Sequence, residues 1–330
     1  MARTAPDIYF FFLRWLHDNL DRLPRQDTRK RILGVLTAIA FFAPNPSAFI
    51  ARLWKRKSGA WWQGTFLEKN MRMKDDKLVM LPLPSPEELQ KSLSEVLPEN
   101  EWKNWNWYDN LTRQYPKKAN SIYAQRCKNL LGSENNDVES RPVDMAWSAF
   151  WGKLWDERRL VLYTQRHWID TFFPGYNPAA PDQIEDSDRP FDWDHIFPQS
   201  YIYNMKRPIL NLWRDRWPRT IGNLRAWPME LNRSDGKMTP TEKLSNGIAE
   251  SFGKQWNKIL PDSATVREAS FIDEDGWKDW QKCDGDEWDI KQALTHDSEL
   301  GKTLLKAITE RLCAIYTNWY ESLDVGNTLS

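Results

Sequence analysis

Hydrophobic residues recur every three or four positions along most of the chain, which is the period of an amphipathic α-helix. Residues 300–319 give the longest such stripe, and 32–43 form an apolar run that predicts a buried helix. A further helix start stands at Ser85, because Pro86 and Glu88 complete the pattern of a capping box. Helical period also covers residues 8–20, 110–132 and 142–172. The pattern therefore predicts a mainly helical protein.

The helical period is broken in one place. Prolines in 172–190 predict a loop, and the short aromatic segment 191–197 that follows predicts a β-strand. Residues 219–227 predict a second strand, and Pro228 and Gly236 are placed to begin and end a short helix after it. We therefore expect a mainly α fold with a small α+β island, in which a helical bundle surrounds a strand-strand-helix motif.

The composition is that of a soluble globular protein. Of 330 residues 41% are hydrophobic and 28% charged, and the net charge of zero gives no long-range attraction to a polyanion. Twenty tryptophans indicate large buried aromatic surfaces, and three unpaired cysteines exclude a disulfide framework. The N-terminus lacks a signal-peptide pattern, and the longest apolar run is too short to span a membrane. We expect a cytoplasmic protein without membrane contact.

Polar residues with one shared chemistry gather on the island. Asp194 and His195 stand side by side at the end of the first predicted strand, Asn223 lies in the second, and Asn232 lies on the short helix. A neutral imidazole takes a proton from water, and carboxylate and amide oxygens are ligands that Mg²⁺ prefers. The set indicates phosphodiester hydrolysis, whereas Asp194 and His195 alone could be an incidental polar pair. Adjacent strand residues point to opposite faces, so these two can share one site only if the chain turns there.

The sequence "DHIFPQS … TIGNLRAWPMELNRSDGKMTP" resembles the HNH, or ββα-metal, endonuclease fold. Within that fold it is most similar to the C-terminal nuclease domain of GmrSD-type modification-dependent restriction enzymes and their phage-defence relatives. "LVLYTQRHW" (160–168) resembles the helix before the catalytic strand of these enzymes, and the likeness covers residues 160–240. On this basis the chain divides into a helical domain (1–140), an HNH-type nuclease domain (141–255) with a basic insertion (204–219), and a C-terminal helical segment (256–330).

The resemblance assigns a role to each motif residue. By this resemblance His195 is the general base, and Asn223 fixes the loop and the histidine ring. Asp194 and Asn232 are the ligands of one Mg²⁺ (or Mn²⁺) ion. It implies a metal-dependent DNA endonuclease that restricts foreign phage DNA, including modified DNA. GmrSD-type enzymes also carry a nucleotide-hydrolysing domain marked by a DGQQR-like motif, which this sequence lacks. We therefore expect a separate NTP-hydrolysing or sensor subunit or domain as a partner, and oligomerisation stays open.

Basic residues near the motif are the candidates for contacts with DNA phosphates. The insertion alternates arginines with tryptophans, which is typical of a surface that grips a backbone, and equally of a solvated helix with tryptophans in the core. The acidic stretch 273–289 predicts a solvated loop, with mimicry of DNA as the alternative. A non-catalytic nucleic-acid-binding module and a helical interaction subunit of a defence complex stay open as other functions. The expected DNA contacts come from Lys237, Arg225, Arg233, Arg214, Arg216 and Arg219.

Overall fold

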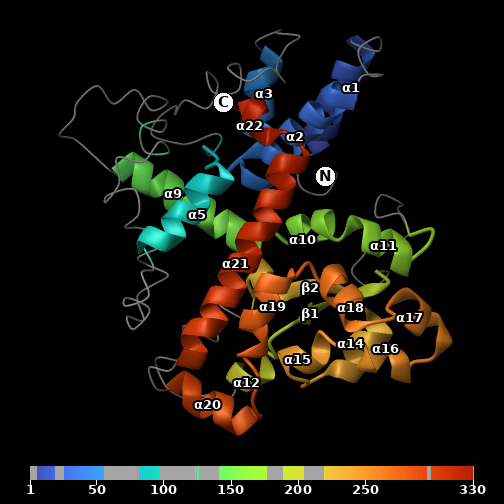
Figure 1. Ribbon diagram of the computed structural model, residues 1–330. Helices are drawn as coiled ribbons and strands as arrows, with labels where there is room; N and C mark the ends of the chain where they lie inside the picture. The colour runs from blue at the N-terminus through green and yellow to red at the C-terminus, as the bar shows by residue number, and fades with distance from the viewer. Residues whose placement is uncertain are drawn as a thin grey trace. The chain divides into compact units, whose positions relative to one another are not determined.

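A computed structural model shows that the protein is mostly helical, with one small antiparallel sheet of two strands (Figure 1). The predicted fold class is confirmed at this level. The predicted helix at 110–132 and the insertion 204–219 lie almost wholly outside the described residues. The structure describes residues 6–18, 26–55, 80, 82–96, 123, 125, 141–176, 189–203, 219–295 and 299–329.

The chain forms two compact units, one of residues 1–154 and 316–330 and the other of residues 155–315. Their borders do not coincide with the predicted borders at 140/141 and 255/256. The long helix α21 (Glu299–Ser322) contributes residues to both units. The first unit also contains α1 (Pro6–Asp18), α2 (Gln26–Phe42), α3 (Pro46–Lys55), α5 (Pro86–Val96), most of α9 (Arg141–Asp156), and α22 (Val325–Leu329).

Aromatic side chains form the core of the first unit. Phe42 stacks on Phe150 with ring centroids 5.6 Å apart, and Trp319 lies 5.3 Å from Phe42. The indole of Trp319 donates a hydrogen bond to the Thr37 hydroxyl, so its polar atom is satisfied although the side chain is fully buried. The expected capping box is also present, because Ser85 and Glu88 exchange backbone-to-side-chain hydrogen bonds. The tryptophan-rich composition thus serves internal packing here.

The second unit consists of short helices around the two strands. A cluster of Phe172, Trp227, Trp256 and smaller apolar residues forms part of its core. Figure 1 shows the strands among these helices. The elements are α10 (Arg158–Thr164), α11 (Arg166–Phe172), β1 (Phe191–His195), α12 (Ser200–Tyr203), the 3-10 turn η4 (Ile221–Asn223), β2 (Leu224–Pro228), α14 (Met229–Asp235), α15 (Pro240–Lys243), α16 (Gly247–Ser251), α17 (Lys254–Ile259), α18 (Ser263–Ala269), α19 (Glu274–Gln281) and α20 (Glu287–Thr295).

Two predicted elements differ from the structure. The helical period over 142–172 belongs to three helices, because the Glu157 side chain caps the start of α10 and Gln165 separates α10 from α11. The acidic stretch 273–289 is not a loop, since it forms α19 and the start of α20. The Asp273 carboxylate accepts a hydrogen bond from the Gly276 amide and begins α19. Acidic residues therefore cap and begin helices in this stretch.

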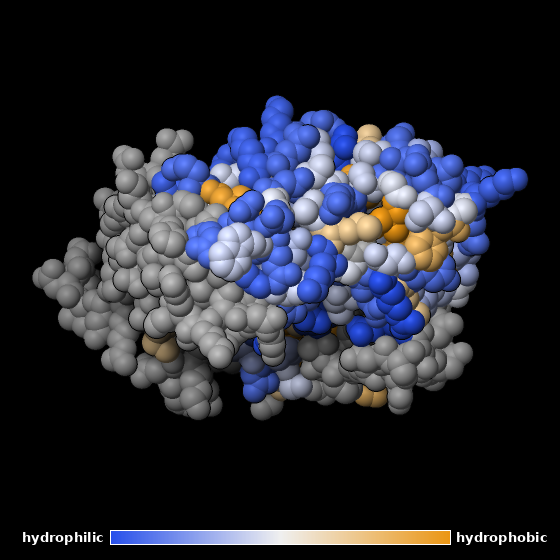
Figure 2. All heavy atoms as spheres, turned by 90° about the horizontal axis from the view of Figure 1, so that it is seen from below, coloured by the Kyte–Doolittle hydropathy of each residue, from blue (hydrophilic) through white to orange (hydrophobic). Residues whose placement is uncertain are grey.

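One face of the molecule is largely polar over its described residues (Figure 2). Figure 2 shows a face that is hydrophilic over most of its described atoms, with hydrophobic residues in small groups. Among the described residues no helix is both long and apolar enough to cross a membrane. Within the described ranges, the large hydrophobic side chains that are exposed are Phe10, Leu13, Leu33, Met145, Phe252 and Trp288.

A glycine in η4 gives a direct test of the packing between α21 and the strand pair. A Cβ added at Gly222 would lie 2.1 Å from the Ile308 carbonyl oxygen, which belongs to α21. We expect Gly222→Ala to lower the free energy of unfolding by roughly 3 kcal/mol, measured by urea denaturation. Gly247→Ala is the control, because there the nearest atom is 3.6 Å away. Equal stability of the two variants would contradict this packing.

Candidate functional site

The strands and α14 follow one another as a strand-strand-helix segment. β1 pairs antiparallel with β2, with Asp194 opposite Arg225 and His195 opposite Leu224. α14 begins directly after β2 and packs against both strands. Gly236 ends α14 with a φ of 28°, in the left-handed region that favours glycine. The predicted order of two strands and a helix is therefore present.

The side-chain amide of Gln165 binds the edge of β2 that faces away from β1. Its Oε1 accepts a hydrogen bond from the Ala226 amide at 2.8 Å, and its Nε2 donates to the carbonyls of Ala226 and Ala269 at 3.5 and 2.6 Å. Gln165 is buried, so all its polar atoms need such partners. Gln165 is not among the expected site residues, although a glutamine within an apolar helical period is a signal for such a buried polar side chain.

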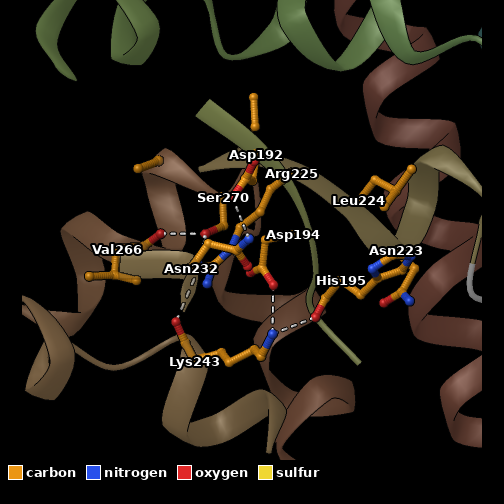
Figure 3. Close-up of polar contacts among 12 residues, drawn as sticks. Asp192, Asp194, His195, Asn223, Leu224, Arg225, Asn232, Lys243, Val266 and Ser270 are labelled. Carbon is orange, nitrogen blue, oxygen red and sulfur yellow. Dashed lines mark hydrogen bonds and ion pairs between the residues drawn. The ribbon is translucent and has the colours of Figure 1, made fainter. Parts of the chain in front are cut away.

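Asp194 is a buried carboxylate held by two cations. Its Oδ2 accepts a hydrogen bond from Arg225 Nε at 2.7 Å, and its Oδ1 accepts one from Lys243 Nζ at 2.6 Å (Figure 3). All three side chains are at most 2% exposed. Burial alone would raise the pKa of Asp194, but the charges and hydrogen bonds of Arg225 and Lys243 lower it below its usual value. The carboxylate is therefore ionised and paired at neutral pH.

Arg225 connects this carboxylate to its surroundings. Its Nη1 donates to the Ser270 hydroxyl at 2.9 Å and to the Lys243 carbonyl at 3.2 Å. Its guanidinium carbon lies 3.8 Å from the centre of the Trp227 ring, a cation–π geometry. The side chain is fully buried. Arg225 is a structural partner of Asp194. Its predicted contact with DNA stays a prediction, which this burial does not favour.

A second buried arginine, Arg311 of α21, binds backbone carbonyls. Its Nη1 donates to the carbonyls of Ile221, Gly222 and Leu224 at 3.0, 2.9 and 2.8 Å, and its Nε and Nη2 donate to Ser270 O at 3.0 and 2.8 Å. Burial, together with the charge of Arg225, lowers the pKa of Arg311 to about 9, so it is charged at neutral pH. Arg311 thus fixes η4. An arginine inside the apolar stripe of α21 was the signal that the sequence offered for it.

Asn223 fixes the loop that follows β1. Its Oδ1 accepts a hydrogen bond from the Phe197 amide at 2.8 Å, and its Nδ2 donates to the Phe197 carbonyl at 3.1 Å. The Asn223 carbonyl also accepts from the Ile196 amide at 2.9 Å. The side chain is fully buried. These bonds place the backbone directly after His195, which is the loop that Asn223 is expected to hold, whereas its influence on the histidine ring stays a prediction.

His195 ends β1 and is partly buried. Burial lowers the pKa of His195 to about 4; the charge of Asp194 raises it, and those of Lys243, Arg158 and Arg219 lower it. The imidazole is therefore neutral at physiological pH, and the charges of one acidic and three basic side chains act on it. Trp193 shares a strand face with His195. The guanidinium carbon of Arg158 lies 5.3 Å from the centre of the Trp193 ring. This face of the hairpin combines a neutral base with cations.

Asn232 contacts Asp192, and not Asp194, with which it is expected to share a metal ion. Its Nδ2 donates a hydrogen bond to Asp192 Oδ2 at 3.3 Å, and Arg233 Nε lies 4.0 Å from the same oxygen. Asp192 and Asp194 are two residues apart on β1 and so share one face, toward which α14 packs. His195 is an odd number of residues away from both, so its side chain points to the opposite face of the strand. β1 runs to His195 without a turn, so the condition for Asp194 and His195 to share one site is not met within the strand.

The arrangement of donors does not fit a divalent metal on Asp194. Each of its carboxylate oxygens already accepts a hydrogen bond from a cation. Arg225 and Lys243 bring two positive charges against one negative charge, and a divalent ion would add to this excess. Among the described residues, no three His, Cys, Asp or Glu side chains group as a metal site. The Mg²⁺ predicted for Asp194 and Asn232 stays a prediction that this geometry does not support.

The remaining predicted DNA contacts are surface residues or lie outside the described residues. The side chain of Lys237 is 70% exposed and its Nζ lies 3.5 Å from Glu287 Oε2, while Arg233 is 73% exposed. Arg219 is exposed and close enough to His195 to affect its pKa. Arg214 and Arg216 lie outside the described residues.

Comparisons with profiles of known protein families, with curated proteins and with solved structures each gave no match. The likeness to HNH endonucleases therefore depends on the motif residues alone.

Removing the Asp194 charge is expected to destabilise the protein strongly. Asp194→Asn would leave the buried cations Arg225 and Lys243 without a counter-charge, so we expect a loss of about 3 kcal/mol in the free energy of unfolding. Asp192→Asn is the control, because that side chain is 39% exposed. Chemical denaturation of the three proteins measures the difference. Equal effects of the two substitutions would contradict a paired, buried Asp194.

The lowered pKa of His195 makes stability depend on pH. Between its folded pKa of about 4 and the unfolded value near 6.5, only the unfolded chain binds the proton. Stability is therefore lost as pH falls through this window, with a slope of up to about 1.4 kcal/mol per pH unit from this one group. We expect His195→Gln to flatten the pH dependence of the unfolding free energy, measured by chemical denaturation at a series of pH values. An unaltered slope in His195→Gln would contradict the shift.

Proposed function

We propose that this protein acts on the phosphodiester backbone of DNA as an endonuclease, with His195 as the general base. The observation that carries the proposal is the place of His195 at the end of β1, in the strand-strand-helix segment, with the loop after it fixed by the buried side chain of Asn223. A phosphodiester is an anion and its hydrolysis requires a proton acceptor for water. A partly buried imidazole with the exposed cations Arg158 and Arg219 near it offers both features.

The chemistry would use the chain's own groups. His195 takes a proton from water, the water oxygen attacks phosphorus, and the bond to the departing oxygen breaks. Arg158 and Arg219 are the cations near His195 that can contact phosphate oxygens from the surface, whereas Lys243 is buried. Asn223 holds the loop after His195 and so keeps the base in place. Restriction of foreign phage DNA, together with an NTP-hydrolysing or sensor partner, is part of the proposal on the resemblance to GmrSD-type enzymes.

A second candidate is a module that binds nucleic acid without cleaving it. The observation that favours it is the engagement of Asp194 with Arg225 and Lys243, because the likeness requires that carboxylate as a metal ligand. A pKa of about 4 also makes His195 a weak base. The exposed cations near His195 would then contact phosphates without a reaction.

Plasmid cleavage by the full chain separates the two candidates. Wild type, His195→Ala and the exposed-histidine control His167→Ala are compared in Mg²⁺, in Mn²⁺ and in EDTA. We expect wild type and His167→Ala to cut alike and His195→Ala to be slower by about 10²-fold or more, because the proton acceptor is lost. The EDTA arm tests the predicted metal requirement separately, and an RNA substrate tests the polymer.

The outcomes have different consequences. If wild type binds the plasmid but does not cut under any of these conditions, the nuclease proposal fails and the binding module is favoured. If it neither cuts nor binds, both candidates fail and a helical interaction subunit is the remaining class. Equal cutting by wild type and His195→Ala would remove His195 from the mechanism.

A further inference from the structure

The ammonium group of Lys243 binds two oxygen atoms of the kinds that also bind metal ions. Its Nζ lies 2.6 Å from Asp194 Oδ1 and 2.8 Å from the backbone carbonyl oxygen of His195. A carboxylate oxygen and a backbone carbonyl oxygen are the donor types that hard cations take in proteins. The side chain is 2% exposed, so it is not available to a phosphate in solution. Figure 3 shows both contacts converging on the lysine nitrogen.

The helix that carries Lys243 is anchored on several sides. Thr239 and Glu242 form a capping box at the start of α15, with Pro240 in its first turn. The Lys243 carbonyl accepts a hydrogen bond from Arg225, which is itself bound to Asp194. These contacts fix the backbone from which the ammonium group reaches Asp194. Separating Lys243 from Asp194 would therefore also disturb the hydrogen bonds that Arg225 forms with both residues.

We propose that Lys243 is the resident cation of this site: its ammonium group holds the place on Asp194 that a divalent metal would need, and it ties that carboxylate to the backbone of His195. Lys243 is thus a positioning residue that makes the end of β1 independent of metal. The inference concerns the occupancy of Asp194 and does not require that the chain cleave nucleic acid.

Binding of Mn²⁺, followed by electron paramagnetic resonance on the full chain, tests this proposal. Wild type is expected to bind no Mn²⁺ through Asp194, so Asp194→Asn should leave its Mn²⁺ binding unchanged. Lys243→Met removes the ammonium and exposes Oδ1 of Asp194 and the His195 carbonyl as oxygen donors, and we expect its Mn²⁺ affinity to rise at least about tenfold. The double variant Lys243→Met/Asp194→Asn should lose this gain. Lys237→Met is the matched control, because Lys237 is an exposed lysine of the same unit.

Two results would overturn the proposal. One is Mn²⁺ binding by wild type that Asp194→Asn abolishes, because Asp194 would then accept a metal in the presence of Lys243. The other is a folded Lys243→Met variant, judged by circular dichroism, whose Mn²⁺ affinity equals that of wild type. If Lys243→Met is unfolded in metal-free buffer, recovery of its helical signal on adding Mn²⁺ supports the proposal, and failure to recover overturns it. None of these readouts uses nuclease activity, so a failed cleavage assay leaves them unaffected.

Discussion

The arrangement of the hairpin depends on one buried carboxylate shared between two cations. Asp194 binds Arg225 on the neighbouring strand and Lys243 on α15, and so joins three elements through one side chain. Burying charged groups costs several kcal/mol each, so such a cluster persists only where every donor and acceptor has a partner. Here Arg225 has Ser270 and the Lys243 carbonyl as further acceptors, and Lys243 has the His195 carbonyl. Because both carboxylate oxygens of Asp194 already accept a hydrogen bond from a cation, the cluster does not favour binding of an additional positive ion.

A third buried positive charge, Arg311, has no carboxylate among these partners and binds backbone carbonyls instead. Its five hydrogen bonds all go to backbone carbonyls, so it replaces water around η4 and Ser270 and fixes their conformation. η4 in turn presents Asn223, whose amide fixes the backbone after His195. A continuous path of hydrogen bonds therefore runs from α21 to the loop beside the candidate base. α21 is the longest described helix of the chain, so a large element holds the turn that leads into β2.

The fold class and the local order of elements could be predicted from the sequence, because they depend on periodicity and on turn residues that act over short distances. β1, β2, α14 and the capping box at Ser85 all follow from such signals. The partners of Asp194 could not be predicted in this way, since Arg225 and Lys243 meet it only through strand register and the position of α15. An arginine in a basic stretch was interpreted as a surface cation, although burial turned it inward. The residues of a motif specify which chemical groups are present, whereas packing decides which of these groups remain available for a ligand.

A sheet of two strands leaves backbone groups unpaired at its outer edges, and these invite a strand from another molecule. Gln165 prevents this at Ala226, because its side-chain amide forms the pair of hydrogen bonds that a third strand would offer. The side chain of Gln165, which lies between α10 and α11, thus takes the place of one residue of a third strand. Loss of this amide would open the edge of β2 at Ala226 to strand addition. It would also remove the hydrogen bonds that join the junction of α10 and α11 to the hairpin.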